Sequence, residues 1–97
     1  MGILEKFSLK GRTAVVSGGA GPLFGSSISE ALAEAGATVV TASRSTERNS
    51  EFATNMQTRG YNVIGMTLDI SNPDSIEEFK NKVVDRYGNV DVLVNNA

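Results

Sequence analysis

Residues 12–44 read RTAVVSGGAGPLFGSSISEALAEAGATVVTASR, and this stretch decides the fold. Residues 13–16 are β-branched or apolar, residues 18–25 are rich in glycine, residues 26–35 have helical periodicity, and residues 38–42 are apolar again. This is the pattern of a strand, a glycine turn, a helix and a second strand. The stretch therefore predicts one βαβ unit.

The glycine turn is suited to binding an anion. Gly18 can adopt backbone angles that a side chain would forbid, and the absence of a Cβ lets a phosphate approach the main chain. The helix that starts near Gly25 offers unpaired N–H groups and the positive end of its dipole. We therefore interpret the first turn of the unit as a candidate pyrophosphate site.

The rest of the chain continues the alternation of helices and strands. We expect a helix over 46–59, a strand over 63–67, a helix over 73–87 that Asn72 caps, and a strand over 90–94. Short connections between strands and helices in this order require a parallel sheet with right-handed crossovers. The predicted fold class is α/β, a Rossmann-type doubly wound parallel sheet with strand order 3-2-1-4 and a cofactor crevice at the carboxyl ends of the strands.

Apolar residues at helical spacing give each predicted helix one face for the sheet. The expected contact residues are Ile28, Leu32 and Ala35 in the first helix, Phe52 and Met56 in the second, and Ile76, Phe79, Val83 and Tyr87 in the third. The first strand has no polar alternation, which indicates burial on both of its faces.

Composition limits the function classes. The 97 residues make one domain at most, and a net charge of −2 gives no electrostatic case for nucleic acid or an anionic membrane. The chain has no cysteine and no histidine, which excludes disulfides and thiolate chemistry and removes the usual metal ligand and neutral-pH base. No apolar stretch approaches ~20 residues, so we expect no membrane partner and a cytoplasmic location.

Polar or glycine-rich clusters follow all four predicted strands. They are Ser17-Gly18-Gly19-Ala20-Gly21 with Gly25, Ser43-Arg44, Asp69, and Asn95-Asn96-Ala97. With these four features in register, the chain from Gly11 onward resembles the short-chain dehydrogenase/reductase family. The resemblance implies an oxidoreductase that transfers a hydride between a nicotinamide cofactor and a small-molecule alcohol or carbonyl substrate.

The resemblance also implies a role for each cluster. Gly18 and the loop to Gly25, with Gly21, Leu23 and Phe24, would hold the pyrophosphate; Asp69 and Ile70 would contact the adenine; and Asn95, Asn96 and Ala97 would line the ribose side and stabilise the centre of the sheet. Two structural alternatives stay open. Asp69 can cap the turn that follows it, and the asparagines can be turn formers without a ligand.

Arg44 bears on the choice between the two nicotinamide cofactors. An NAD site places a carboxylate at the end of the second strand for the ribose hydroxyls, whereas an NADP site needs a cation for the 2′-phosphate. Here the strand ends in Ser43-Arg44, and the nearest acid is Glu47. A guanidinium binds phosphate with two hydrogen bonds and Ser43 can add a hydroxyl donor, so we expect NADP rather than NAD.

The chain departs from the family pattern in two places. Gly18 and Gly25 are one residue further apart than in Gly-x-x-x-Gly-x-Gly, with Leu23 at the middle position and Pro22 as the extra residue. The family's catalytic Tyr-x-x-x-Lys is absent, because Tyr61 and Tyr87 are followed four positions later by Gly65 and Asp91. We therefore assign no catalytic residue.

The reading that follows is that residues 1–97 are the N-terminal part of one dinucleotide-binding domain, truncated after the fourth strand and without the catalytic half. An uncovered edge on an apolar strand favours the same interpretation. The resemblance implies a homo-oligomer for the intact protein. Two alternatives remain, a non-catalytic dinucleotide-sensing module and a partner-binding α/β domain; a P-loop hydrolase is disfavoured because no Gly-Lys-Ser/Thr follows the turn.

Overall fold

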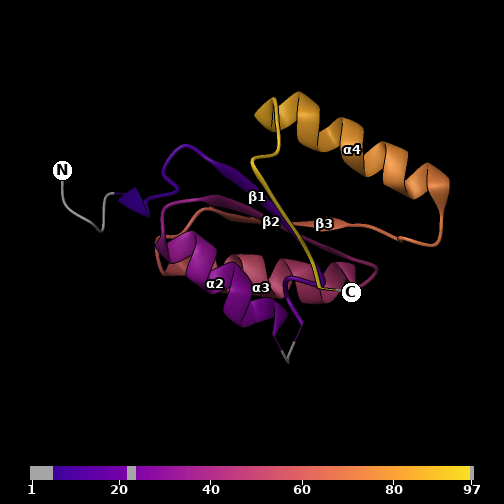
Figure 1. The fold of residues 1–97 in the computed structure, drawn as a ribbon. Coiled ribbons are helices and arrows are strands. Elements are labelled where there is room, and N and C mark those ends of the chain that lie inside the picture. The colour runs from indigo at the N-terminus through magenta and orange to yellow at the C-terminus, as the bar shows by residue number, and fades with distance from the viewer. Residues whose placement is uncertain (1–5, 22–23, 97) are drawn as a thin grey trace.

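The computed structural model describes residues 6–21 and 24–96, and Figure 1 shows a sheet with helices on both of its faces. The elements are β1 (Thr13–Ser17), α2 (Gly25–Glu34), β2 (Thr38–Ser43), α3 (Thr46–Thr58), β3 (Val63–Thr67), α4 (Pro73–Tyr87) and β4 (Val92–Asn95). The strands in these residues are parallel and lie in the order β3-β2-β1-β4, which confirms the predicted arrangement. In the same residues every helix is too short or too polar to cross a lipid bilayer.

Strand β1 lies in the middle of the sheet and is buried along its whole length, as its unbroken apolar sequence predicts. Ala14 and Val16 face the core beneath α2 and α3, while Val15 faces the core beneath α4. Val39 and Val40 of β2 divide between the two faces in the same way. The period-two geometry of a strand therefore builds two cores from one apolar run.

Helix α2 packs on the sheet through smaller residues than its apolar pattern predicts. Ile28 and Leu32 contact the core but are only partly buried. The fully buried positions are Gly25, Ser29 and Ala33, which recur every four residues and form one face of the helix. Because these side chains are small, the helix axis can approach the strands closely, and the larger apolar residues lie beside the contact.

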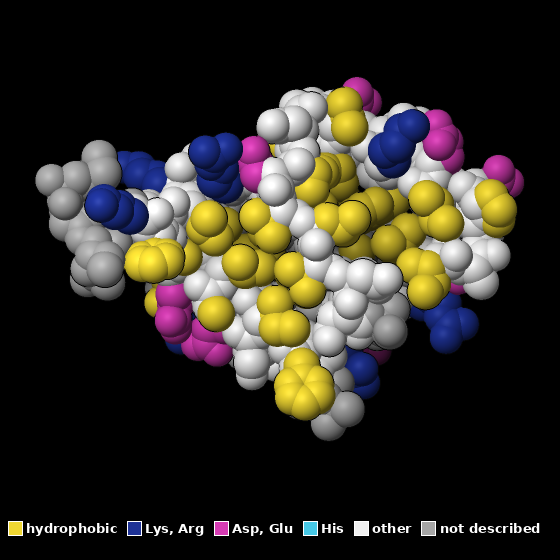
Figure 2. Space-filling model, viewed as in Figure 1, with side chains coloured by type: hydrophobic (Ala, Val, Ile, Leu, Met, Phe, Trp, Pro, Cys, Tyr) yellow, Lys and Arg dark blue, Asp and Glu magenta, His cyan; other side chains and the backbone are white. Residues whose placement is uncertain are grey.

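Helix α4 lies on the opposite face of the sheet and is the one helix on that face among the described residues, as Figure 1 shows. Phe79, Val83 and Tyr87 pack against this face as predicted, whereas Ile76 is 44% exposed at the start of the helix. Leu93 of β4 is 72% exposed on the same side of the molecule. Figure 2 shows hydrophobic side chains gathered between α4 and β4, so this side carries a continuous apolar surface.

The prediction that the fourth strand begins at Val90 is wrong, since β4 begins at Val92. Asp91 makes contacts that delay the start of the strand. Its backbone N–H donates to Thr13 O at 2.9 Å, and its carboxylate accepts the Thr13 N–H at 2.8 Å. The carboxylate therefore takes the place of a ladder carbonyl, and regular pairing with β1 starts one residue later, between Ala14 and Val92.

Candidate functional site

The sequence-predicted site residues lie at one edge of the sheet. Ser17 pairs with Ala42 on one side and with Asn95 on the other, so β1, β2 and β4 end together. Ser43 pairs with Thr67, which places the end of β3 in the same row. The Gly18 turn, Arg44, Asp69 and Asn96 each follow one of these strand ends, and the fold brings together four segments that are distant in sequence.

The glycine turn is held by its own backbone. Gly18 has a φ of +68°, and its N–H donates to Ala42 O at 2.7 Å, which ties the turn to the end of β2. The Gly21 N–H donates to Gly18 O at 3.0 Å, and the Ser26 N–H donates to Gly21 O at 3.1 Å. A Cβ on Gly25 would overlap the Gly18 carbonyl oxygen, so only glycine fits there. The turn is thus compact, and it lies directly before the N-terminus of α2.

The N-terminus of α2 differs from those of α3 and α4. Ser45 and Asn72 cap α3 and α4 by accepting backbone N–H groups, and Glu47 and Asp74 place an acid in the first turn of each. The N-cap position of α2 is occupied by Phe24, whose side chain has no acceptor for a backbone N–H, and the first turn of α2 has no acidic residue. The positive end of this helix therefore lacks the compensation that the other two helices have.

Asn95 at the end of β4 contacts the end of β1, and Asn96, which follows it, contacts the glycine turn. The Ser17 hydroxyl donates to Asn95 Oδ1 at 3.1 Å and accepts the Asn96 N–H at 3.2 Å. Asn96 Nδ2 donates to Gly18 O at 3.4 Å. The end of β4 therefore supports the turn after β1. These contacts join two neighbouring strands at the centre of the sheet.

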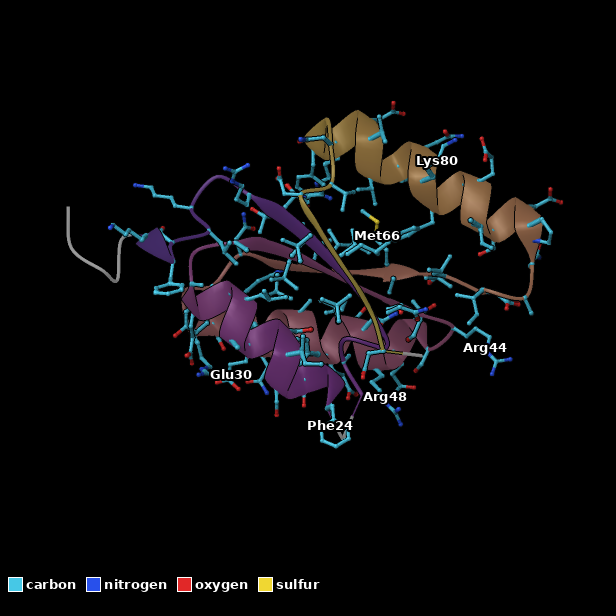
Figure 3. All side chains as sticks on the ribbon, in the orientation of Figure 1. Phe24, Glu30, Arg44, Arg48, Met66 and Lys80 are labelled. Atoms are coloured by element: carbon cyan, nitrogen blue, oxygen red, sulfur yellow. The ribbon has the colours of Figure 1, made fainter. Side chains whose placement is uncertain are left out.

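A depression of about 270 Å³ lies between the ends of β2 and β3. Its lining includes Gly18, Ser43, Arg44, Leu68, Asp69 and Ile70. Arg44 is exposed, and Figure 3 shows its side chain extending from the loop after β2 toward solvent. Ile70 is 60% exposed beside it and presents an apolar surface. The depression thus combines a cation, a carboxylate and an apolar contact.

Asp69 caps its own turn. Its Oδ1 accepts the Ser71 hydroxyl at 2.6 Å and the Ser71 N–H at 3.0 Å. These hydrogen bonds, and to a smaller extent the charge of Arg44, hold the pKa of the Asp69 carboxyl below its usual value. The Asp69 N–H donates to the Ser75 hydroxyl at 2.9 Å. Asp69 therefore has the turn-capping role that the sequence left open as an alternative. Contact between Asp69 and the adenine stays a prediction.

The model of one protein family, the short chain dehydrogenases, matches residues 12–97. The chain belongs to this family.

The chain is similar to several members of this family in sequence and in fold. It is 38% identical to the short chain dehydrogenase/reductase dpchG of Colletotrichum higginsianum, over 92% of this chain and 33% of the relative. The crystal structure of 2-keto-3-deoxy-D-gluconate dehydrogenase from Streptococcus agalactiae superposes with a TM-score of 0.87 at 33% identity, over 98% of this chain and 35% of that one. The Pseudomonas aeruginosa RhlG/NADP active-site complex has a TM-score of 0.85 at 33% identity, over 94% and 36% of the two chains. The present chain thus spans about a third of the length of the relatives that it matches.

Sequence reasoning missed three polar side chains that support the candidate site. Ser17, which the motif contains, joins β1 to both asparagines, and Ser29 is fully buried with its hydroxyl donating to Gly19 O at 2.7 Å. Asn49 is 1% exposed in α3 and bonds to the ends of β2 and β3. Ser29 and Asn49 are polar residues at positions where helical periodicity predicts burial, and this pattern could have identified them from the sequence.

Two of the predicted site residues, Leu23 and Ala97, lie outside the described residues, as does Pro22. Phe24 is 70% exposed, and Figure 3 shows its ring directed away from the sheet. Within residues 6–21 and 24–96, no three His, Cys, Asp or Glu side chains come together as a metal site.

Proposed function

We propose that this chain is the N-terminal, cofactor-binding part of an NADP(H)-dependent oxidoreductase that acts on an alcohol or carbonyl substrate. The observation that carries the proposal is the pairing of the glycine cradle at α2 with Arg44 at the end of β2, in a chain of the short chain dehydrogenase family. The alternative function, a dinucleotide-binding module without catalysis, predicts the same binding and differs only in turnover.

The residues of the turn fit a pyrophosphate. A Cβ at Gly25 or at Gly21 would crowd the Gly18 carbonyl, so the cradle exists because these positions lack side chains. The start of α2, which has no side-chain cap, would present the positive end of its dipole to the anion. The lengthened loop that contains Leu23 would complete the contact.

Arg44 is the group that would select the 2′-phosphate of NADP. In the described part of the chain, Arg44 takes part in none of the salt bridges, which use Arg12, Arg59, Lys80 and Lys82. Its guanidinium is therefore available to a phosphate. The Ser43 hydroxyl donates to Asn49 Oδ1 at 3.0 Å, so Arg44 and not Ser43 would supply the principal donor.

The remaining predicted residues would hold the adenosine and ribose portions. Ile70 would offer an apolar surface to the adenine, and Asp69, Asn95 and Asn96 lie at or directly after strand ends on the same edge. The role of Ala97 stays a prediction from the family resemblance. RhlG, a relative at 33% identity, was solved as a complex with NADP, which supports a dinucleotide at this edge without deciding between NADP and NAD.

The bound cofactor would supply hydride transfer, and this chain would orient it. The family's Ser, Tyr and Lys set has no counterpart among the 97 residues, so the proposal places catalysis in a further part of the protein. The apolar surface at Leu93 and Val84 supports a covering partner of that kind, since Leu93 is 72% and Val84 46% exposed.

The test is a calorimetric titration of the full-length protein with NADP and with NAD. We expect NADP to bind more tightly, and Arg44→Ala to weaken NADP binding by roughly 10–100-fold while NAD binding changes little, because charge-assisted hydrogen bonds contribute about 1.5–3 kcal/mol each. The matched control is Lys80→Ala. This removes an equal charge from the outer side of α4, where Figure 3 shows Lys80 (63% exposed) far from Arg44.

Two results would overturn the proposal. One is an unsubstituted protein that binds neither dinucleotide or prefers NAD. The other is an Arg44→Ala variant that keeps the original ratio of NADP to NAD affinity. Substrate turnover with NADP would separate the enzyme from the non-catalytic module.

A further inference from the structure

Asn49 is a fully buried polar residue in the first turns of α3. It is 1% exposed, among the most buried side chains in the described residues. Helix α3 sits directly on β3 at this point, since a Cβ at Gly65 would lie 2.6 Å from the Asn49 carbonyl oxygen. An amide group in such a place is costly unless its hydrogen bonds are made.

The Asn49 amide makes three hydrogen bonds to two adjacent strands. Its Nδ2 donates to Met66 O of β3 at 2.9 Å and to Ser43 O of β2 at 3.2 Å. Its Oδ1 accepts the Ser43 hydroxyl at 3.0 Å. The side chain thus binds both the main chain and the side chain of the residue immediately before Arg44.

The segments held by Asn49 are those that line the depression between β2 and β3. The Leu68 N–H also donates to Ser43 O, at 2.8 Å, so this one carbonyl receives donors from α3 and from the segment after β3. Ser43, Arg44 and Leu68 all line the depression. The Ser45 N–H, on the other side of Arg44, donates to the Ser43 hydroxyl at 3.3 Å. The backbone on both sides of Arg44 is therefore tied, through Ser43, to Asn49.

We infer that Asn49 is a positioning residue for cofactor selection: it fixes the direction in which the loop after β2 presents Arg44. Asn49 itself is buried and touches no ligand. It acts through Arg44, and its loss would cost the 2′-phosphate contact rather than the dinucleotide contacts common to NADP and NAD. This inference rests on the proposed function.

A purely structural role predicts a different result. If Asn49 only stabilised the fold, its replacement would lower the folded fraction and weaken NADP and NAD equally. If it positions Arg44, the ratio of the two affinities changes, because only NADP carries the group that Arg44 would bind. The ratio is measured on folded protein and does not depend on the overall stability.

The experiment replaces Asn49 by Leu, which keeps a similar volume and removes all three hydrogen bonds. The full-length protein is titrated with NADP and with NAD, and we expect the NADP-to-NAD affinity ratio to fall about tenfold, because a displaced guanidinium loses a charge-assisted contact. In an Arg44→Ala background the same replacement should leave the ratio unchanged. Asn55→Leu, the same change at an exposed position of α3, is the matched control.

Ser43→Ala is the second variant, used if Asn49→Leu fails to fold. It removes one of the three hydrogen bonds, and we expect the ratio to fall about threefold. In an Arg44→Ala background Ser43→Ala should leave the ratio unchanged, whereas loss of a direct contact between Ser43 and the phosphate would still lower it. An unchanged ratio in the folded variant, alongside an Arg44-dependent NADP preference in the unsubstituted protein, would overturn this inference alone. Failure of the unsubstituted protein to bind NADP would overturn the proposed function and this inference together.

Discussion

Replacing Gly25 by alanine tests whether the glycine turn is rigid. Gly25 is the first residue of α2 and is buried against Gly18. An added Cβ would overlap the Gly18 carbonyl oxygen, which already accepts the Gly21 N–H at 3.0 Å and Asn96 Nδ2 at 3.4 Å. The Gly18 N–H donates to Ala42 O at 2.7 Å, so the backbone of Gly18 is held by hydrogen bonds at both its N–H and its carbonyl and cannot move without losing one of them.

Two opposing effects set the magnitude of the change at Gly25. Alanine in place of glycine in a helix is favourable by roughly 0.5–1 kcal/mol. Overpacking costs about 1–3 kcal/mol, and an overlap between two backbones belongs at the upper end of that range because neither atom is at the end of a flexible side chain. The net expectation is a loss of about 2 kcal/mol in the free energy of unfolding. A decrease in the free energy of unfolding would indicate a rigid turn, and an increase would indicate a turn that can adjust.

The assay is urea denaturation of the full-length protein followed by circular dichroism, with NADP affinity measured in parallel. Gly60→Ala is the control: nothing lies within 4 Å of its added Cβ, and its φ of +89° costs about 1–2 kcal/mol through strain alone. We expect Gly25→Ala to weaken NADP binding and Gly60→Ala to leave it unchanged. A Gly25→Ala variant as stable as the parent, or more stable, would refute a rigid turn.

Two further predictions concern stability. Hydrogen bonding, chiefly from the Thr13 N–H, holds the pKa of Asp91 below its usual value, so its stabilising contribution is present above about pH 4 and is lost as the pH falls through the lowered pKa. Asp91→Asn should therefore lose less stability than the parent in urea titrations repeated from about pH 5 to pH 2, and an equal loss would contradict this assignment. Replacing Met56, which is 2% exposed, by alanine should lower the free energy of unfolding by about 2–5 kcal/mol. Phe7→Ala, at a 70% exposed position, should change it by less than about 0.5 kcal/mol in the same denaturation assay, and equal effects would contradict the described core.

The order of the elements was predictable because local signals agreed with the global fold. The apolar runs of β1 and β2 are too short for buried helices and lack alternation, which indicates a parallel sheet. Gly60 and Gly88 follow helices with φ values of +89° and +84°, as their positions after apolar stripes indicated. The family resemblance, which rested on features at all four strand ends, was confirmed by the match of the family model to residues 12–97.

The details that the sequence did not predict depend on contacts between distant segments. Asp91 looked like part of an apolar strand, and only its contact with Thr13 shows that its carboxylate takes the place of a ladder carbonyl, so that regular pairing begins at Val92. Ser43 looked like a phosphate donor, but its hydroxyl proton is directed to Asn49. A polar side chain has several possible partners, and sequence spacing cannot choose among them. The ligand roles of the site residues stay predictions for the same reason.

The position of β4 beside β1 has a consequence for how the protein is made. Asn96 supports the Gly18 turn across a separation of 78 residues, so a nascent chain would complete β1, β2 and β3 before the last support of the turn leaves the ribosome. Closing so long a loop carries a larger entropic cost than joining neighbouring βαβ strands. We expect the Arg44 side of the crevice to form early in synthesis and the Gly18 side to mature late.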